Sequence, residues 1–192
     1  MSETLLVSND GELQHKLDTV EAFVSQNGHL IPIAHLLLFS PTGEVYTQCR
    51  SSKKQILANQ EIPFAAGGRC DSRDLHAGTG KEEISYRKTI IREGQEEIGI
   101  NLRRNDLRKV HNLPEILDLG PEGRFFARVY HAIYDPQRHG EFNVDPYEVS
   151  SSPLLKNIDE IEKITRKVFP SIYSDPLIQQ IRELSIRIKS SK

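Results

Sequence analysis

Residues 92–100 constrain the fold more than any other part of the chain. Their sequence, Arg-Glu-Gly-Gln-Glu-Glu-Ile-Gly-Ile, places Glu93, Glu96 and Glu97 at spacings of three and four residues. On an α-helix these carboxylates lie on one face, one turn apart, where like charges repel one another. A divalent cation would compensate the repulsion, and oxygen ligands without His or Cys suit Mg²⁺ or Mn²⁺ better than Zn²⁺. The ordinary alternative is an acidic helix face open to solvent.

The residues around this segment predict how such a helix is held. Ser85 is a candidate N-cap, and Gly99 is a candidate for the residue that ends the helix. Residues 62–68 form an extended segment that ends in Gly67 and Gly68, where the backbone can approach a ligand closely. The apolar side of the helix, opposite the acids, consists of Ile84, Ile90, Ile91 and Ile98.

This order of strand, glycine loop and acidic helix resembles the Nudix box of the Nudix hydrolase superfamily. The family pattern is Gly, five residues, Glu, seven residues and then Arg-Glu-aliphatic-any-Glu-Glu-any-Gly-aliphatic. Its second half matches Arg92, Glu93, Glu96, Glu97, Gly99 and Ile100. The resemblance implies an α+β Nudix fold, an α/β/α sandwich with a mixed sheet. It also implies a magnesium-dependent hydrolase that cleaves a phosphoanhydride bond in a nucleoside diphosphate linked to another group, or in a related organic diphosphate.

The first half of the pattern departs from the chain, because Ile84 occupies the position of the family's first Glu, and Gly78, at the position of the family's glycine, does not follow a predicted strand. We therefore expect Gly68 to be the box glycine and residues 69–81 to be an enlarged loop beside the site. Glu82 or Glu83 could replace the missing acid from a neighbouring position. Ile84 itself is expected to be a buried or half-buried helix-entry residue outside the metal site.

The resemblance implies roles for individual residues. Glu93, Glu96 and Glu97 are expected to bind the metal, with the Gly67 carbonyl oxygen as a fourth ligand, and one acid is expected to act as general base. Arg92 is expected to orient a ligand glutamate through a buried ion pair, and these residues form the predicted catalytic set. No role is assigned to any of the seven histidines. The candidates for substrate binding are Arg50, Lys53, Gly67 and Gly68.

Two further segments are similar to the isopentenyl-diphosphate-isomerase-like branch of the superfamily. Residues 39–53 contain Gln-any-Arg followed by Lys, and residues 145–149 match an acidic-any-Glu-Val segment in which Glu148 could supply a ligand. The isomerase needs a cysteine in a Cys-Gly-His run where this chain has Ala66-Gly67-Gly68, and a metal-binding histidine near Ile31. Its chemistry is therefore disfavoured. It stays as an alternative beside a noncatalytic Nudix-fold binding module.

The remaining pattern predicts the elements around the site. Leu13, Leu17, Val20 and Val24 recur at helical spacing, which predicts an N-terminal helical extension over residues 1–28. A Nudix domain with C-terminal helices would then occupy residues 29–192. Strands are expected at 31–39, 45–50, 116–119 and 125–134, and helices at 158–168 and 177–188.

Composition narrows the classes of partner. The net charge of −2 over 192 residues provides no basic field for nucleic acid. No apolar run has the length of a membrane span or the form of a signal peptide, so a cytoplasmic protein is the default expectation. Cys49 and Cys70 are too few for a disulfide framework. The expected partner is a small-molecule diphosphate, with neither nucleic acid nor membrane, and a homodimer stays open.

Overall fold

Twelve strands and four α-helices make up the described part of the chain. The computed structural model describes residues 3–17, 29–77 and 82–191. The helices are α1 (Tyr86–Ile98), α2 (Pro136–His139), α3 (Ile158–Val168) and α4 (Ser171–Ser190). The strands are β1 (Thr4–Val7), β2 (Leu13–Leu17), β3 (Ile31–Phe39), β4 (Val45–Cys49), β5 (Glu61–Ile62), β6 (Ala66–Arg69), β7 (Leu75–Ala77), β8 (Glu82–Ile84), β9 (Arg108–Lys109), β10 (Ile116–Asp118), β11 (Arg124–Ile133) and β12 (Leu154–Lys156).

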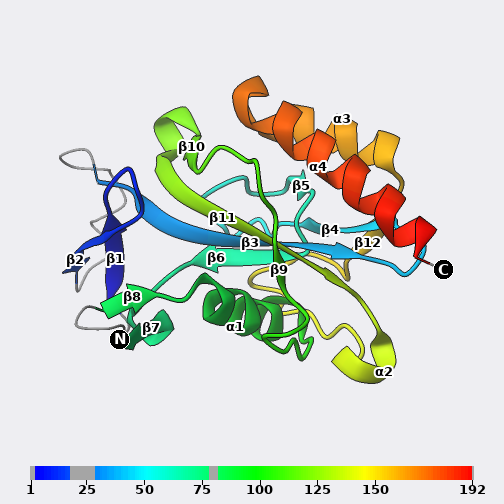
Figure 1. Cartoon of the computed structure of the whole chain (residues 1–192), viewed down its shortest axis with the longest axis horizontal. Helices are drawn as coiled ribbons and strands as arrows, with labels where there is room; N and C mark the ends of the chain where they lie inside the picture. The colour runs from blue at the N-terminus through cyan, green and yellow to red at the C-terminus, as the bar shows by residue number, and fades with distance from the viewer. Residues whose placement is uncertain (1–2, 18–28, 78–81, 192) are drawn as a thin grey trace.

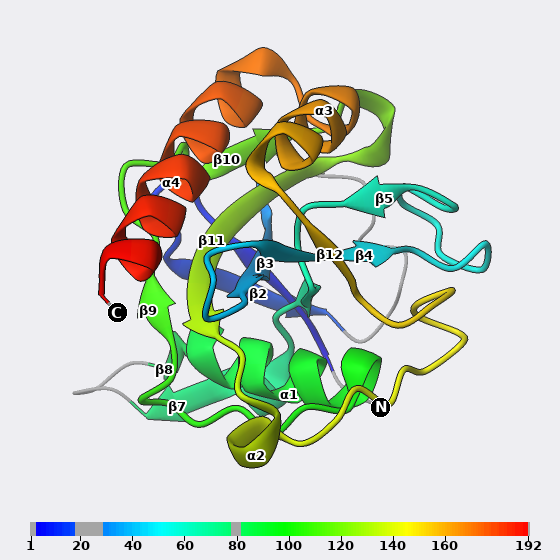
Figure 2. The same ribbon diagram turned by 90° about the vertical axis from the view of Figure 1, so that its right-hand side faces the viewer.

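A mixed sheet lies between helices on both of its faces (Figures 1 and 2). Its strands follow the order β10-β11-β3-β4-β12, and β3 is parallel to β11 but antiparallel to β4 and β6. Helix α1 covers one face, and α3 with α4 covers the other. This arrangement confirms the predicted α+β fold with a mixed sheet between helices.

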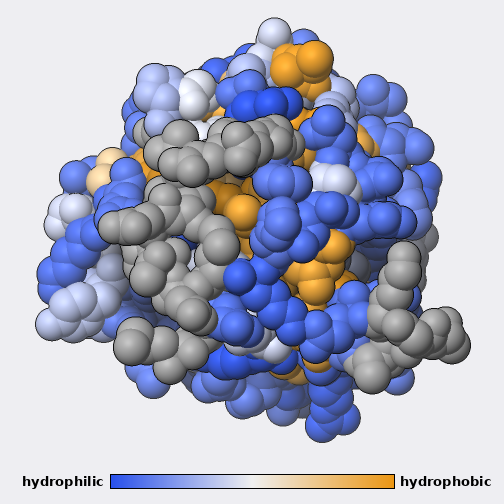
Figure 3. All heavy atoms as spheres, turned by 90° about the vertical axis from the view of Figure 1, so that its left-hand side faces the viewer, coloured by the Kyte–Doolittle hydropathy of each residue, from blue (hydrophilic) through white to orange (hydrophobic). Residues whose placement is uncertain are grey.

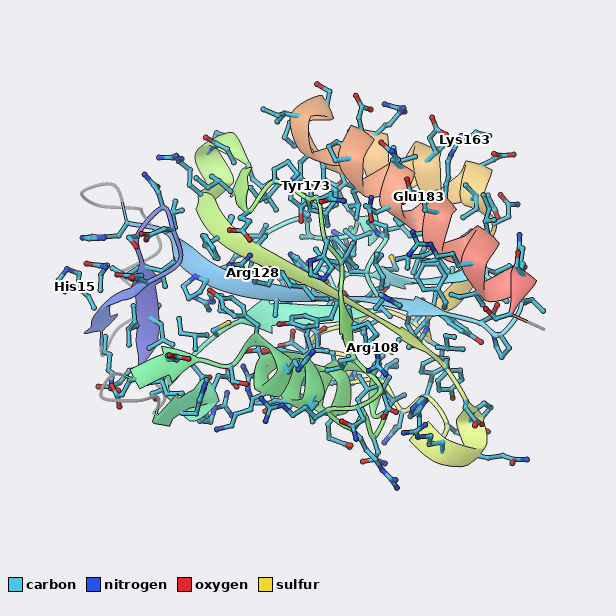
Figure 4. The ribbon with its side chains drawn as sticks, viewed as in Figure 1. His15, Arg108, Arg128, Lys163, Tyr173 and Glu183 are labelled. Carbon is cyan, nitrogen blue, oxygen red and sulfur yellow. The ribbon has the colours of Figure 1, made fainter. Side chains whose placement is uncertain are left out.

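Strand β3 supplies both cores because its side chains alternate between the two faces. Ile33 and Leu37 belong to the core beneath α3 and α4, whereas Leu36 and Leu38 belong to the core beneath α1. Burial on both faces explains the continuous apolar run from which the strand was predicted. Figure 4 shows Tyr173 of α4 between that helix and the sheet.

Two strands share one edge of β3, which creates a split in the sheet. Strand β6 pairs with β3 at residues 33–36, and β4 pairs with it only at residues 38–39. Since β11 occupies the whole opposite edge of β3, β4 and β6 follow one another along the same edge. Their neighbouring ends form the place at which the acidic helix meets the sheet.

The N-terminal helix predicted from the apolar spacing is wrong over residues 13–17. These residues form β2, which pairs antiparallel with β1. Leu5 and Val7 of β1 are fully buried, and Val7 exchanges backbone hydrogen bonds with Leu30. Strand β1 thus provides backbone hydrogen-bond partners for residues 13–17, which the spacing of apolar residues does not reveal. Val20 and Val24 lie outside the described residues, and the domain boundary at residue 28 stays a prediction.

The predicted loop at residues 69–81 is partly regular structure. A 3₁₀ turn, Ser72–Asp74, leads into a hairpin in which Leu75 of β7 pairs with Ile84 of β8. Ile84 is half-buried as predicted, and it is the last residue of β8, directly before the Ser85 N-cap of α1. The insertion therefore places ordered residues directly beside the start of α1.

The C-terminal helices match the prediction at α3 and differ at α4. Helix α4 begins at Ser171, six residues before the predicted position, and continues through Pro176. Phe169 and Tyr173 pack with ring centroids 5.5 Å apart in the core. This contact stabilises the first turns of α4, although Pro176 disfavours a helix at this position. Within the described residues, no helix combines the length and the apolar character that crossing a membrane requires.

Candidate active site

Helix α1 carries the three predicted acids along the split edge of the sheet. Ile90 and Ile98 are fully buried and hold the helix against β3, and Gly99 ends it in the left-handed conformation with φ of 74°. Ser85 occupies the N-cap position, as predicted, although its side chain makes no capping hydrogen bond. The acids therefore lie where the local pattern of apolar residues and glycine predicts.

Glu97 is the most buried of the acids, with 1% of its surface exposed. Its Oε2 atom accepts a hydrogen bond from the Gly67 N–H at 2.9 Å and another from Gln48 Nε2 at 3.1 Å. Its Oε1 atom is buried and has no hydrogen-bond partner among the described residues. Burial, followed by the charge of Glu93, raises the pKa of Glu97 to about 7. Gln48 therefore belongs to the site, although the sequence analysis assigned it no role.

The double glycine allows Glu93 to lie directly against β6. A Cβ atom on Gly68 would lie 2.4 Å from the carboxyl carbon of Glu93, and one on Gly67 would lie 2.6 Å from the Ala34 carbonyl oxygen. The Gly67 contact is with the backbone, so that position requires glycine, whereas a side chain at Gly68 would displace the Glu93 carboxylate. Burial raises the pKa of Glu93, and the charge of Arg92 opposes this rise. The close approach expected at these glycines is present, and their contact with substrate stays a prediction.

Arg92 connects the acids to the inserted segment. Its Nη1 atom lies 2.5 Å from Glu93 Oε1 and 3.0 Å from Glu96 Oε2, and its Nη2 atom donates to Asp74 Oδ2 at 2.9 Å. Only 16% of the Arg92 side chain and 2% of the Asp74 side chain are exposed. Burial alone would lower the pKa of Arg92, but its hydrogen bond to Asp74 and the charges of Glu93 and Asp74 raise it overall. The ion pair predicted for Arg92 is therefore present.

Asp74, rather than Glu82 or Glu83, supplies the further acid beside Arg92. The Asp74 carbonyl oxygen accepts a hydrogen bond from the Ser85 N–H at 2.9 Å, which places it next to Ile84, where the family pattern has its first Glu. Glu82 and Glu83 are exposed and pair with Lys16 and His76. The only sequence signal for Asp74 is its spacing from Asp71, with which it forms a capping box.

Glu96 differs from the other two acids because it faces solvent. Its side chain is 46% exposed and lies between Arg92 and Arg73, whose Nη1 atom is 3.3 Å from Glu96 Oε1. Across residues 3–17, 29–77 and 82–191, no group of three or more His, Cys, Asp or Glu side chains is arranged so that it could hold a metal ion. The unpartnered Glu97 oxygen and the Glu93 carboxylate nevertheless suit Mg²⁺, which takes few protein carboxylates. The ligand roles of Glu96 and the Gly67 carbonyl stay predictions.

A cavity of about 490 Å³ adjoins the acids at Gly67 and Gly68. Its lining combines four cationic residues with apolar ones and also includes His35, Gln55, Tyr147 and Glu148. Lys53 and Lys54 both line it; Lys53 lies 3.4 Å from the centre of the Tyr147 ring, and Lys54 pairs with Glu148. The cationic residues are Arg50, Lys53, Lys54 and Arg69, and the apolar ones include Ile33, Ile56, Leu57, Ile62, Leu117, Leu119, Phe125 and Phe169. Arg50 and Lys53 thus line the cavity, and their contact with substrate stays a prediction. Lys54, to which the sequence analysis gave no role, lines the cavity as well.

His35 of β3 also lines this cavity. Its ring stacks on that of Phe64, with centroids 4.3 Å apart and an interplanar angle of 10°. Both ring nitrogens are buried and have no hydrogen-bond partner in the part of the chain that the structure describes. Burial and the charge of Arg50 lower the pKa of His35 to about 3, so the ring is neutral. No signal in the sequence distinguishes this histidine from the other six.

The isomerase alternative receives no support from the cysteine nearest the site. Cys70 is fully buried, and Thr89 Oγ1 donates a hydrogen bond to its sulfur at 3.2 Å. Burial raises the pKa of the Cys70 thiol, which keeps it protonated. A reactive cysteine needs partial exposure and a lowered pKa. Cys70 is therefore a packing residue.

Comparison with solved structures identifies the fold. No protein-family model and no curated protein sequence matches the chain. A Nudix hydrolase of Alicyclobacillus acidocaldarius matches with a TM-score of 0.58 and 16% identity, covering 84% of this chain and 94% of its own. A MutT protein of Methanosarcina mazei matches at 0.55 and 17%, covering 83% and 96%, and a protein of Deinococcus radiodurans at 0.61 and 14%, covering 95% and 98%.

At these identities the likeness shows the fold alone. The chain has the Nudix fold that its acidic helix predicted, with α1 and the split sheet edge in the places described above. The resemblance to the isopentenyl-diphosphate-isomerase-like branch stays a prediction.

Proposed function

We propose that the protein is a magnesium-dependent hydrolase of a nucleoside diphosphate linked to another group, or of a related organic diphosphate. One observation carries the proposal: Glu97 is buried with an unpartnered oxygen, and Glu93 lies half-buried beside it with 13% of its side chain exposed, where a cation-lined cavity begins. Buried carboxylates are costly unless a cation or a proton compensates them. Cationic side chains facing a cavity beside them suit phosphate groups.

The metal would be held by Glu93 and Glu97, together with Glu96 and the Gly67 carbonyl as predicted from the family pattern. When bound, Mg²⁺ would neutralise phosphate charge and lower the pKa of a bound water. Arg92 holds Glu93 in place through the ion pair at 2.5 Å. One of the clustered acids would receive the proton from the attacking water.

Substrate binding falls to the cationic end of the cavity. Lys54 and Arg50 line the same cavity as Gly67, and their positive charges lower the pKa of Glu97, which supports a shared contact with the diphosphate. Lys53 lies further along the same wall, near Tyr147. A phosphate in this position would be flanked by cations on one side and by the acids with their metal on the other.

The test is phosphate release from a panel of nucleotide, sugar, dinucleotide and isoprenoid diphosphates, with Mg²⁺ and with EDTA. We expect Mg²⁺-dependent turnover that falls more than about 100-fold in Glu97→Gln, because a direct metal ligand contributes more than the residues behind it. Glu162→Gln on α3 is the matched control, since α3 lies on the opposite face of the sheet from α1 (Figure 1). Turnover of Glu97→Gln near the wild-type rate would contradict the assignment. Binding without any turnover would favour the noncatalytic module.

A further inference from the structure

The cavity beside the acids opens onto the apolar core beneath α3 and α4. Its volume of about 490 Å³ lies in the range of sites for small organic molecules. Every aliphatic or phenylalanine residue of its lining belongs to this core or packs against it. Most of them are buried, but Ile56, Leu57 and Leu119 are half-buried where they pack against the core. These three side chains therefore present much of the apolar surface that a ligand in the cavity would meet.

The order of the strands sets the apolar lining to one side of the acids. Leu117 of β10 pairs with Phe125 of β11, and β11 lies along one edge of β3. Strand β6, whose Gly68 approaches Glu93 closely, lies along the other edge of β3. A diphosphate at the acids, which the proposed function requires, can therefore extend its organic group across β3 toward the apolar lining.

Several polar side chains of the lining gather around two lysines. Lys53 lies over the ring of Tyr147. Lys54 pairs with Glu148, and Gln55 is the next residue in the chain. The side chains that carry charge or hydrogen-bonding groups thus come from other segments than the apolar side chains of β10 and β11.

The backbone behind the apolar surface is also engaged. The Ile56 carbonyl oxygen accepts a hydrogen bond from Arg50 Nε at 2.9 Å, and the Leu57 carbonyl oxygen accepts one from the Gln60 N–H at 3.1 Å. The ring nitrogens of His35, which also lines the cavity, are enclosed by protein. A nucleobase against this surface would lose water without gaining hydrogen bonds, whereas a hydrocarbon chain has no polar groups to satisfy.

Leu57 has a backbone conformation that leucine rarely adopts. Its φ of 56° lies in the left-handed region, which glycine and asparagine occupy readily and larger side chains avoid. Asn59, two residues later, has nearly the same φ of 58° without this disadvantage. A leucine held in a disfavoured conformation beside a cavity indicates that its side chain has a role there.

We infer that the cavity binds a hydrocarbon chain attached to the diphosphate, and that Leu57 is a specificity-determining residue for this chain. The substrate class is then the diphosphate ester of an aliphatic alcohol. Such a molecule carries its charge at one end, which the cationic residues of the cavity suit, and its other end gains by leaving water. The inference rests on the proposed function only for the position of the diphosphate.

The first test measures binding along a series of chain lengths, separately from turnover. Isothermal titration calorimetry with Mg²⁺ would compare methylenebisphosphonate, its linear alkyl monoesters from methyl to decyl, and the α,β-methylene analogue of ADP. We expect the affinity to rise about fourfold for each methylene group that is buried, until the chain fills the cavity. The decyl ester should bind more tightly than the ADP analogue. An affinity independent of chain length, or tighter binding of the ADP analogue, would overturn the inference.

The second test separates a role in binding from a role in packing. Leu57→Asn removes the apolar side chain and suits the left-handed backbone. Leu113→Asn is the matched control, because Leu113 packs half-buried against the same core but lies outside the cavity lining. Leu57→Gly makes the same test if the Asn variant does not fold.

We expect Leu57→Asn to weaken the decyl ester about tenfold and to leave the methyl ester unchanged. Its urea midpoint should change little, because the relieved backbone offsets the lost packing, whereas Leu113→Asn should lose stability and keep the preference for decyl. An equal loss of decyl binding in both variants would overturn the role of Leu57. The expected chain preference without Mg²⁺-dependent turnover would support the inference and overturn the proposed function. Turnover of nucleotide substrates with no chain preference would do the reverse.

Discussion

Two clusters of arginines and carboxylates in this molecule use the same chemical groups in different surroundings. The Arg92 cluster consists of Arg92, Asp74, Glu93 and Glu96, and the α3–α4 cluster consists of Glu162, Arg166, Asp175 and Arg182. Both contain ion pairs in which nitrogen and oxygen atoms lie at hydrogen-bonding distance. Arg92 is 16% exposed and its partner Asp74 2%, whereas Arg166 is 49% exposed and its partner Asp175 56%.

The difference in burial decides what each cluster does. Exposed ion pairs contribute little, because water screens the charges and the long side chains lose entropy on pairing. A buried charge that loses its partner is far more unfavourable. Figure 4 shows Lys163 projecting outward from α3 and labels Glu183 on α4, and Figure 3 shows a further face with apolar patches between hydrophilic residues. Charged side chains on these outer surfaces are exposed to water, as is usual, whereas the charges of Arg92 and Asp74 are largely buried.

Removing the central arginine should separate the two clusters most clearly. Arg92→Met leaves the buried Asp74 carboxylate without its partner, and we expect the free energy of unfolding to fall by about 3 kcal/mol. Arg166→Met is the matched change in the α3–α4 cluster and should leave the urea midpoint almost unchanged. Urea denaturation at pH 7 measures both variants. Equal shifts would show that burial does not distinguish the clusters.

The pH dependence of stability should have opposite signs at Glu97, which lies beside the Arg92 cluster, and at Glu162 of the α3–α4 cluster. In the metal-free protein, the folded-state pKa of Glu97 is raised to about 7 from an ordinary value of 4.5. Its favourable contribution is therefore present below pH 4.5 and lost as the pH rises to 7. We expect Glu97→Gln to be more stable than the wild type by about 2 kcal/mol at pH 8 and to lose this advantage by pH 4.5.

The hydrogen bonds to Glu97 are retained in this substitution. Both hydrogen bonds to Glu97 go to Oε2, so a glutamine carbonyl oxygen can accept them while its NH₂ group replaces the unpartnered Oε1. At Glu162 the hydrogen bond from Arg166 lowers the pKa, so its contribution is present above the ordinary pKa and lost in acid. Melting temperatures between pH 4 and 8, measured with EDTA, check both signs. A Glu97→Gln variant that is less stable at pH 8 would contradict the expectation.

Neutralising the acid behind the arginine should have the smallest of these effects. Asp74→Asn keeps the shape of the side chain but weakens its hold on Arg92, and hence the position of Glu93. We expect kcat to fall about tenfold with KM nearly unchanged, since residues that orient ligands typically contribute at least this much. Asp175→Asn is the matched control in the exposed cluster. A kcat that follows only the fraction of folded protein would reduce Asp74 to a structural residue.

Local patterns predicted much of this structure. The bounds of β3 and α3 follow directly from their apolar runs, and the left-handed Gly99 ends α1 as its position predicted. The patterns were insufficient where a distant partner decides the outcome. Residues 13–17 pair with β1 instead of forming a helix, and α4 starts early because Tyr173 enters the core.

The sequence by itself determined the acidic face of α1, because helical geometry brings residues three and four apart to the same side whatever surrounds them. It also determined the glycines at 67 and 68, without revealing which side chains would approach them. Only the tertiary structure decided that Asp74 meets Arg92 and that His35 faces the cavity. These contacts join β3, the inserted segment and α1, and their positions depend on how the sheet splits and on which backbone groups pair across it. Such pairing is a property of the whole chain, so no local spacing of residues encodes it.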